Sequence, residues 1–231
     1  MTTTPRIDDV VYDARMTVNL AEDLLLLGYE DDGTPTPDSG TLDYGLAGAV
    51  LVELALEGRI RLAAGRVHVD EPAFTGDRVL DHGLDRITGY GRDATPGELL
   101  DGIRGGLRDR VLEGLVARKV LRRETHRILL VPHPRFPSAT GGQPPVETET
   151  RARLTAFVNG GPADPRTHAL ATLAVAAGLT ASAFPDTPRT QIERRLAEQG
   201  PEPWPAATVR EILDEIQIAI VAITTMFMTG G

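Results

Sequence analysis

The chain has 231 residues, of which 41% are hydrophobic and 25% are charged, and its formal net charge is −9 at pH 7. This composition is ordinary for a globular protein with a buried core, and the absence of cysteine excludes disulfides, zinc thiolate sites and thiol nucleophiles. The acidic balance argues against a nucleic-acid partner, because that affinity depends on neutralising many phosphates.

The N-terminal residues contain no basic stretch followed by an apolar run, so they do not have the pattern of a secretory signal. Together with the absence of cysteine, this makes a cytoplasmic location the natural expectation, and the length allows one large domain or two small ones. The first predicted helix begins at Asn19, a favoured N-cap residue, and ends at Gly28.

The next segment, from Gly45 to Gly58, predicts a helix that is apolar nearly all round. Only Glu53 and Glu57 break its apolar surface. A helix of this kind must be buried on all sides, so we expect it at the centre of a helical domain. A polar, proline-bearing loop over residues 30–43 is expected to connect it to the first helix.

Residues 59–69 alternate between polar and apolar side chains around Gly65, which is typical of a β-hairpin. A helix is predicted over residues 77–87. Another is predicted to begin at Thr95, where a capping box is followed by proline, and to run into a longer helix that ends near Lys119.

A second hairpin is predicted from two short β-like runs. The run from Ile128 to Val131 is expected to pair with Val120 and Leu121 across the residues between them. The five prolines within residues 132–145 then predict a loop.

Further helices are expected beyond this loop. The first begins near Val146, and the next two begin at Asp164–Pro165 and Thr187–Pro188, each a cap residue followed by proline. The last is expected over residues 205–228; its apolar run is too short to cross a bilayer, which needs about twenty residues, so a buried terminal helix is expected. The predicted fold class is mainly α, a single helical bundle with one or two β-hairpins.

A basic segment interrupts the acidic chain between Arg104 and Arg127. Eight basic residues against three acidic ones give this segment a net charge of +5. The basic residues are Arg104, Arg108, Arg110, Arg118, Lys119, Arg122, Arg123 and Arg127. Such a segment can hold phosphate or lie near an anionic membrane, although from charge alone a solvated helix face followed by a charged hairpin tip is the simpler explanation.

Four sequence blocks occur in an order that resembles the Golgi phosphoprotein 3 (GPP34) family. They are Asn19–Gly28, Gly45–Ile60, Val111–Leu121 and Ile128–Val131. The resemblance implies that residues 1–15 are a tail and that residues 16–231 form one domain with the helical-bundle fold of that family, as a bacterial-type member.

Relatives of known function bind phosphatidylinositol 4-phosphate, so the resemblance implies a peripheral adaptor at the inner face of the membrane, with an anionic lipid headgroup as its partner. The family holds the headgroup with a tryptophan and an arginine near the second helix and two arginines before the second hairpin. Arg108 matches one of these arginines. The other falls on Gly105, next to Arg104, and the first arginine is replaced by Ala47. No tryptophan occurs over residues 36–43, so the implied headgroup site is degenerate.

The family also has an apolar hairpin that contributes to membrane or subunit contact. Its match here consists of Ile128, Leu129, Leu130 and Val131. The resemblance thus implies that these residues contact a membrane or a second copy of the chain, giving a homo-oligomer. They would make a buried strand equally well.

The missing headgroup positions leave a second hypothesis open, in which the same cleft serves a small apolar metabolite. Asp43 and Tyr44 are then the candidate proton acceptor and donor, and Arg104 or Arg108 polarises a carbonyl or stabilises an enolate. Such a set suits dehydration, cyclisation or isomerisation in specialised metabolism, although an ordinary polar loop explains any single residue as well. No metal or other cofactor is expected, because the five histidines show no ligand spacing and no phosphate-binding glycine motif is present.

Overall fold

Helix α3 (Leu42–Leu56) runs through the middle of the computed structural model, which describes residues 18–36, 41–91, 94–128, 131–162, 164–198 and 214–222. The other helices in this part of the chain are α2 (Leu20–Leu27), α4 (Arg78–Tyr90), α5 (Pro96–Arg104), α6 (Leu107–Ala117), α7 (Pro145–Val158), α8 (Pro165–Ala176), α9 (Thr180–Ala183), α10 (Arg189–Ala197) and a segment at 214–222. The strands are β1 (Ile60–Ala63), β2 (Arg66–Val69), β3 (Glu124–Ile128) and β4 (Val131–Arg135), in two antiparallel hairpins. The prediction of a mainly α fold with hairpins is confirmed.

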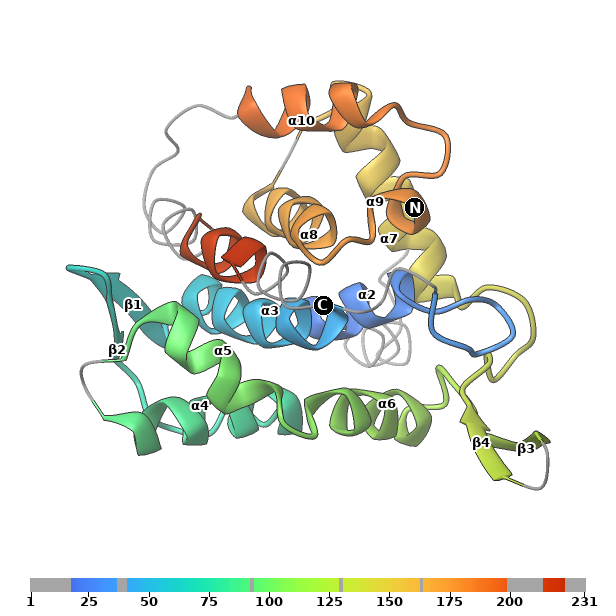
Figure 1. The fold of residues 1–231 in the computed structure, drawn as a ribbon, viewed down its shortest axis with the longest axis horizontal. Coiled ribbons are helices and arrows are strands. Elements are labelled where there is room, and N and C mark those ends of the chain that lie inside the picture. Colours follow the sequence, from blue (N-terminus) through green and yellow to red (C-terminus); the bar gives the residue numbers. More distant parts are fainter. Residues whose placement is uncertain are drawn as a thin grey trace, which may run out of the picture.

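The helices form layers around α3. Helices α4, α5 and α6 lie on one side of α2 and α3, while α7, α8 and α10 lie on the other (Figure 1). Every residue from Gly45 to Ala55 is buried, as the all-round apolar pattern predicts. Helices α3 and α4 approach closely because Gly83 of α4 has no side chain: a Cβ added there would lie 2.2 Å from a methyl group of Val50 in α3.

The first helix and the first hairpin also agree with the sequence. Asn19 caps α2 in a capping box with Glu22, and the helix ends before Gly28. Strands β1 and β2 pair from Ile60 opposite Val69, with Gly65 at positive φ in the turn between them.

Several boundaries differ from the predictions. Helix α3 begins at Leu42, so Asp43 is helical instead of belonging to the loop. Helix α10 has Pro188 as its N-cap without a side-chain hydrogen bond, so the predicted cap at Thr187 is wrong. The short helix α9 carries no cap signal and was not expected from the sequence.

The predicted pairing of the second hairpin is wrong. Strand β3 pairs with β4, and Ile128 lies opposite Val131, so the predicted run spans the end of one strand and the start of the next. Leu121 instead forms a bridge with Ser138. The prolines of β4 predicted a loop, because proline has no backbone N–H to donate within a sheet. A strand nevertheless tolerates proline at positions where that N–H would point to the free edge. Leu129 and Leu130 lie outside the described residues.

The helical segment at 214–222, hereafter the C-terminal helix, confirms the helix predicted there over the part that is described. Ile216 and Ile220 are buried, whereas Ile218 and Val221 are exposed, so only one face is covered. No helix among the described residues is long and apolar enough to cross a membrane. The predicted N-terminal tail and the rest of the predicted last helix lie outside the described residues.

Candidate functional site

The candidate arginines lie where α5 turns into α6. A capping box between Thr95 and Glu98 starts α5, and Gly105 and Gly106 follow its last residue, Arg104. Gly106 has a φ of 70°, a left-handed conformation that glycine adopts without a steric penalty. This two-glycine corner places Arg104 at the end of one helix and Arg108 in the first turn of the next.

Arg108 forms an ion pair with Asp43. Its Nε atom lies 2.7 Å from Oδ1 of Asp43, which stands in the first turn of α3. A carboxylate is favourable at that position because it faces the positive end of the helix dipole. Arg108 also hydrogen-bonds Tyr29, whose pKa is raised chiefly by burial, an effect that Arg108 opposes.

Arg104 belongs to a second exposed cluster. Its Nε donates to Oδ1 of Asp101 at 2.9 Å, and the hydroxyl of Tyr44 donates to the same oxygen at 3.3 Å. The guanidinium carbon of Arg104 lies 4.7 Å from the centre of the Tyr44 ring, a cation–π distance. Burial, and then the Asp101 charge, raise the pKa of Tyr44, so Tyr44 keeps its proton.

Each of these two clusters has one positive and one negative side chain, because Arg104 is paired with Asp101 and Arg108 with Asp43. Both ion pairs are partly exposed, with 26% and 42% of the Arg108 and Arg104 side chains accessible to solvent. Exposed ion pairs contribute only about 0–1 kcal/mol, so either arginine can exchange its carboxylate for another anion at little cost.

The hairpin β3–β4 stands away from the helices, as Figure 1 shows, but its base is held tightly. Phe136 N donates to Gly33 O at 2.9 Å, Arg122 N donates to Pro137 O at 2.9 Å, and Arg135 Nη1 lies 2.9 Å from Asp32 Oδ2. These contacts fix the hairpin against the loop between α2 and α3. The direction in which the hairpin points is therefore set by the body of the protein.

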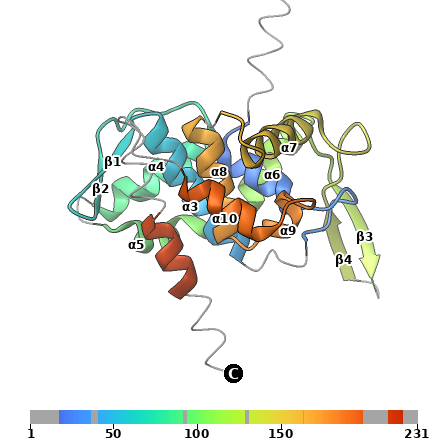
Figure 2. The same ribbon diagram turned by 90° about the horizontal axis from the view of Figure 1, so that it is seen from above.

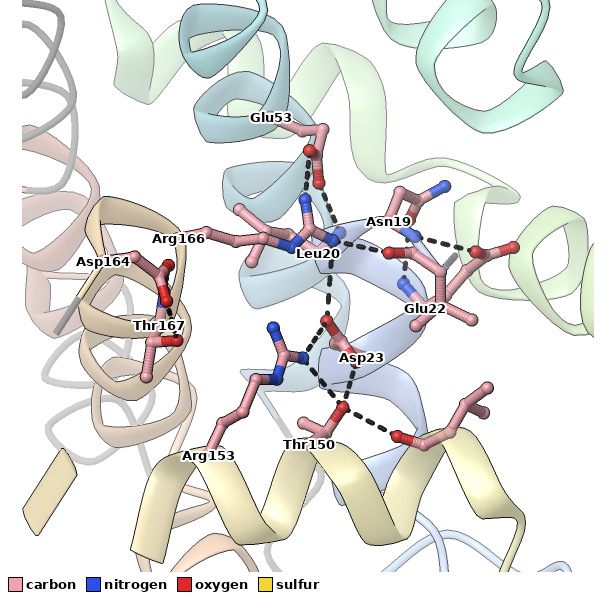
Figure 3. A network of polar contacts seen from close by, with 12 residues as sticks. Asn19, Leu20, Glu22, Asp23, Glu53, Thr150, Arg153, Asp164, Arg166 and Thr167 are labelled. Atoms are coloured by element: carbon pink, nitrogen blue, oxygen red, sulfur yellow. Dashed lines mark hydrogen bonds and ion pairs between the residues drawn. The ribbon is translucent and has the colours of Figure 1, made fainter. Parts of the chain in front are cut away.

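A buried network of charged residues joins α2 to its neighbours (Figure 3). Arg166 of α8 contacts Glu53 of α3 and donates to the carbonyl of Val18 at 2.6 Å. It also lies 3.5 Å from Asp23 of α2, and Glu53 accepts from the backbone N–H of Leu20 at 2.6 Å. One guanidinium thus links α2, α3 and α8.

The network continues on the other side of Asp23. Thr150 and Arg153 of α7 both donate to the Asp23 carboxylate. Next to it, Glu22 accepts from the backbone of Asn19 and forms an ion pair with Arg118 at the end of α6. Burial raises the pKa of both carboxyls, although the neighbouring arginines and Thr150 oppose this effect.

Among the described residues, no group of three or more His, Asp or Glu side chains is placed so that it could hold a metal ion. The family model of Golgi phosphoprotein 3 (GPP34) matches residues 20–216. The chain belongs to the GPP34 family. The match runs from the first residue of α2 to the C-terminal helix and so includes the two-glycine corner, the hairpin and the buried network. No match to a curated protein was found.

In this GPP34 chain, four of the residues proposed from sequence come together at the surface, whereas Ala47 and Gly105 contribute no side chain to it. Asp43, Tyr44, Arg104 and Arg108 come together on the surface where α3 meets the two-glycine corner. Ala47 is fully buried in the core, so it cannot touch a ligand at the surface. A Cβ added to Gly105 would meet nothing within 4 Å, so this position offers space but no side chain.

Sequence reasoning missed three contributors to this surface and to the fold beneath it. Asp101 accepts a hydrogen bond from Arg104, and Tyr29 is hydrogen-bonded to Arg108. Arg166 connects the carboxylates of the buried network. Asp101 carries a weak local signal, because it lies three residues before Arg104 on the same helix. Tyr29 and Arg166 carry none, since their partners are distant in sequence.

Proposed function

We propose that this GPP34 protein is a peripheral membrane adaptor that attaches to anionic lipid surfaces. The end of hairpin β3–β4 enters the interface, and the arginines of the two-glycine corner contact headgroups. The observation that carries the proposal is the register of the hairpin: Ile128 is paired with Val131 where the two strands end, and the sequence between them is Leu129-Leu130.

The anchored base of the hairpin supports this role. A hairpin whose base is already held has less conformational freedom to lose when its end enters a lipid layer, so less of the transfer free energy of its apolar side chains is offset. Full transfer of one aliphatic side chain contributes about 1.5–3 kcal/mol, whereas each arginine near an anionic surface contributes about 1 kcal/mol. The hairpin therefore supplies most of the affinity.

The state of the arginines argues for weak headgroup specificity. Arg104 and Arg108 each have a carboxylate partner, and Ala47 is buried beneath the surface. We expect vesicles that contain phosphatidylinositol 4-phosphate to bind little better than phosphatidylserine vesicles of equal charge. The metabolite hypothesis has less support, because Asp43 and Tyr44 are held by different partners in exposed pairs instead of forming one acid–base pair.

Vesicle co-sedimentation tests the proposal directly. Wild-type protein should bind phosphatidylcholine vesicles that contain phosphatidylserine, and the double substitution Leu129→Glu/Leu130→Glu should abolish that binding. Phe74→Glu is the matched control, because Phe74 is 83% exposed in the segment that follows β2. Figure 1 shows β2 at the opposite end of the molecule from hairpin β3–β4. Unchanged binding by the hairpin variant, or no binding by wild type, would contradict the proposal and favour a search for an apolar ligand.

A gain-of-function variant tests the headgroup part. Gly105 has an ordinary φ of −61° and open space around it, so Gly105→Arg adds a guanidinium beside Arg108 without strain. We expect this variant to prefer phosphatidylinositol 4-phosphate vesicles by about fivefold, corresponding to one additional arginine. Gly89→Arg on α4, which also has open space, should not show the preference.

A further inference from the structure

The C-terminal helix has two apolar faces, of which only one is covered. Ile216 and Ile220 are 0% and 2% exposed, four residues apart on one side. Ile216 packs close to Gly48 of α3, where an added Cβ would lie 3.1 Å from it. Ile218 and Val221 stand on the other side and are 66% and 63% exposed. The helix is therefore docked on the core by one face and presents aliphatic side chains to solvent on the other.

The charges around this helix are distributed unevenly. Asp214 and Glu215 are exposed at its start, and no charged residue occurs from Ile216 to Gly231. In Figure 2 the end of the helix that carries residue 222 points away from the body. Its acidic residues thus lie toward the body and its uncharged end projects outward, so this end meets less electrostatic repulsion from an anionic surface than the start of the helix would.

In Figure 2 the C-terminal helix and hairpin β3–β4 extend toward the same side of the helical body, although in Figure 1 the hairpin also runs downward past α6 and the C-terminal helix does not. The helix also touches α5, since a Cβ added to Gly97 would lie 3.6 Å from Ala219. Arg104 ends that same helix. A flat surface on the side shown in Figure 2 can therefore meet both the hairpin and the C-terminal helix.

We propose that the exposed face of the C-terminal helix, Ile218 and Val221, is a second lipid-contact site that enters the interface of an anionic membrane. This inference rests on the proposed function and adds a separate insertion point to it. A lipid layer fits this face better than a second copy of the chain, because the acidic residues are held back and the helix extends toward the same side as the hairpin in Figure 2. The segment lies in the interface without spanning it, because its apolar run is shorter than a bilayer requires.

Site-specific fluorescence gives the sharpest test, since the chain has no cysteine and each introduced cysteine is unique. The variants Ile218→Cys, Leu130→Cys and Phe74→Cys are each labelled with a fluorophore whose emission shifts to the blue in apolar surroundings. On addition of phosphatidylcholine–phosphatidylserine vesicles, the labels at Ile218 and Leu130 should shift and the label at Phe74 should not.

Vesicle co-sedimentation of Ile218→Glu/Val221→Glu provides the second measurement. Both side chains are exposed, so the variant should keep its circular dichroism spectrum and its midpoint of unfolding. We expect it to bind the vesicles at least about tenfold more weakly, because two aliphatic side chains lose their transfer free energy. Phe74→Glu should bind as the wild type does.

The outcomes separate this inference from the proposed function. A shift at Leu130 without a shift at Ile218 would overturn the inference and leave the hairpin anchor intact. No shift at either position, together with no co-sedimentation, would overturn both. A blue shift at Ile218 that grows with protein concentration in the absence of vesicles would mean that a second copy covers this face, and would overturn the inference.

Discussion

Arg166 shows how much of this fold depends on one side chain. It contacts Glu53 and Asp23 and also holds the carbonyl of Val18, so it joins two helices to the segment that enters α2. Both carboxylates are nearly inaccessible to solvent, with 1% of the Asp23 side chain and 8% of the Glu53 side chain exposed. Removing the guanidinium would leave two buried negative charges with fewer partners.

We therefore expect Arg166→Met to lower the free energy of unfolding by about 3–5 kcal/mol. Arg189→Met is the control, because Arg189 pairs with Glu193 on the exposed surface of α10 and should cost no more than about 0.5 kcal/mol. Urea denaturation followed by circular dichroism measures both. Equal losses in the two variants would show that the buried pair contributes no more than a surface pair.

At this scale the sequence revealed the local features and not the distant ones. The Asn19 cap and the Thr95 box could be recognised because their partners lie three residues away. The partners of Asp23 could not, since Thr150 and Arg153 are more than a hundred residues further along the chain. A pair of acidic residues in the first turn of a helix suggests only a favourable dipole interaction.

Among the elements, hairpin β3–β4 depends on a single glycine at its base. Gly33 has a φ of +79°, and a Cβ added there would lie 2.2 Å from the backbone nitrogen of Pro137. No real side chain tolerates such a contact, so the loop between α2 and α3 and the base of the hairpin would have to separate.

We expect Gly33→Ala to free the hairpin while leaving the helical core folded. Amide hydrogen exchange should become faster over residues 121–139 and remain unchanged in α3. Gly65→Ala is the matched control: its φ of +70° imposes a similar backbone strain of about 1–2 kcal/mol, but nothing lies within 4 Å of the added Cβ. Unchanged exchange around the hairpin in Gly33→Ala would contradict this account.

The same hairpin shows why some elements are harder to predict than others. Helix α3 was predicted well because its apolar residues leave no polar face, and such a pattern has few alternatives. The second hairpin had two β-like runs to choose from, and the prolines at 132 and 134 made the true partner strand look like a loop. Its register depends on contacts with Gly33 and Asp32, which lie in a different part of the sequence.

For the molecule as a whole, the buried carboxyls make stability depend on pH in an unusual direction. Burial raises the pKa of Asp23 above its ordinary value of 3.8. A carboxyl with a higher pKa in the folded chain binds its proton more tightly there than in the unfolded chain. Its contribution to the free energy of unfolding is therefore largest at acidic pH and falls as the pH rises through the raised pKa.

We expect Asp23→Asn, which stays neutral at every pH, to lack this dependence. As the pH rises from acidic to neutral, wild type should lose stability relative to Asp23→Asn in chemical denaturation. The comparison with Glu98→Gln should have the opposite sign. Hydrogen bonds from Thr95 lower the pKa of Glu98, so wild type should gain stability relative to Glu98→Gln as the pH rises. Parallel curves for wild type and Asp23→Asn would contradict the assignment.

The arrangement of layers explains why the candidate surface was only partly foreseen. Asp43, Tyr44, Arg104 and Arg108 come together because α3 passes beside the two-glycine corner, a proximity that the family resemblance implied and spacing along the chain could not. The neutralising partner Asp101 changes the chemistry of that surface. It became evident only when the helices were packed.

The two prolines of β4 have a consequence for self-association. Pro132 and Pro134 occupy alternate positions of the strand, opposite Arg127 and Thr125. Neither proline can donate a backbone hydrogen bond, so the free edge of β4 cannot pair with a strand from a neighbouring molecule. An apolar hairpin with an open strand edge would otherwise be prone to pair with other copies and form fibrils. The two prolines prevent such pairing along the edge of β4 and leave the apolar residues of the sequence unchanged.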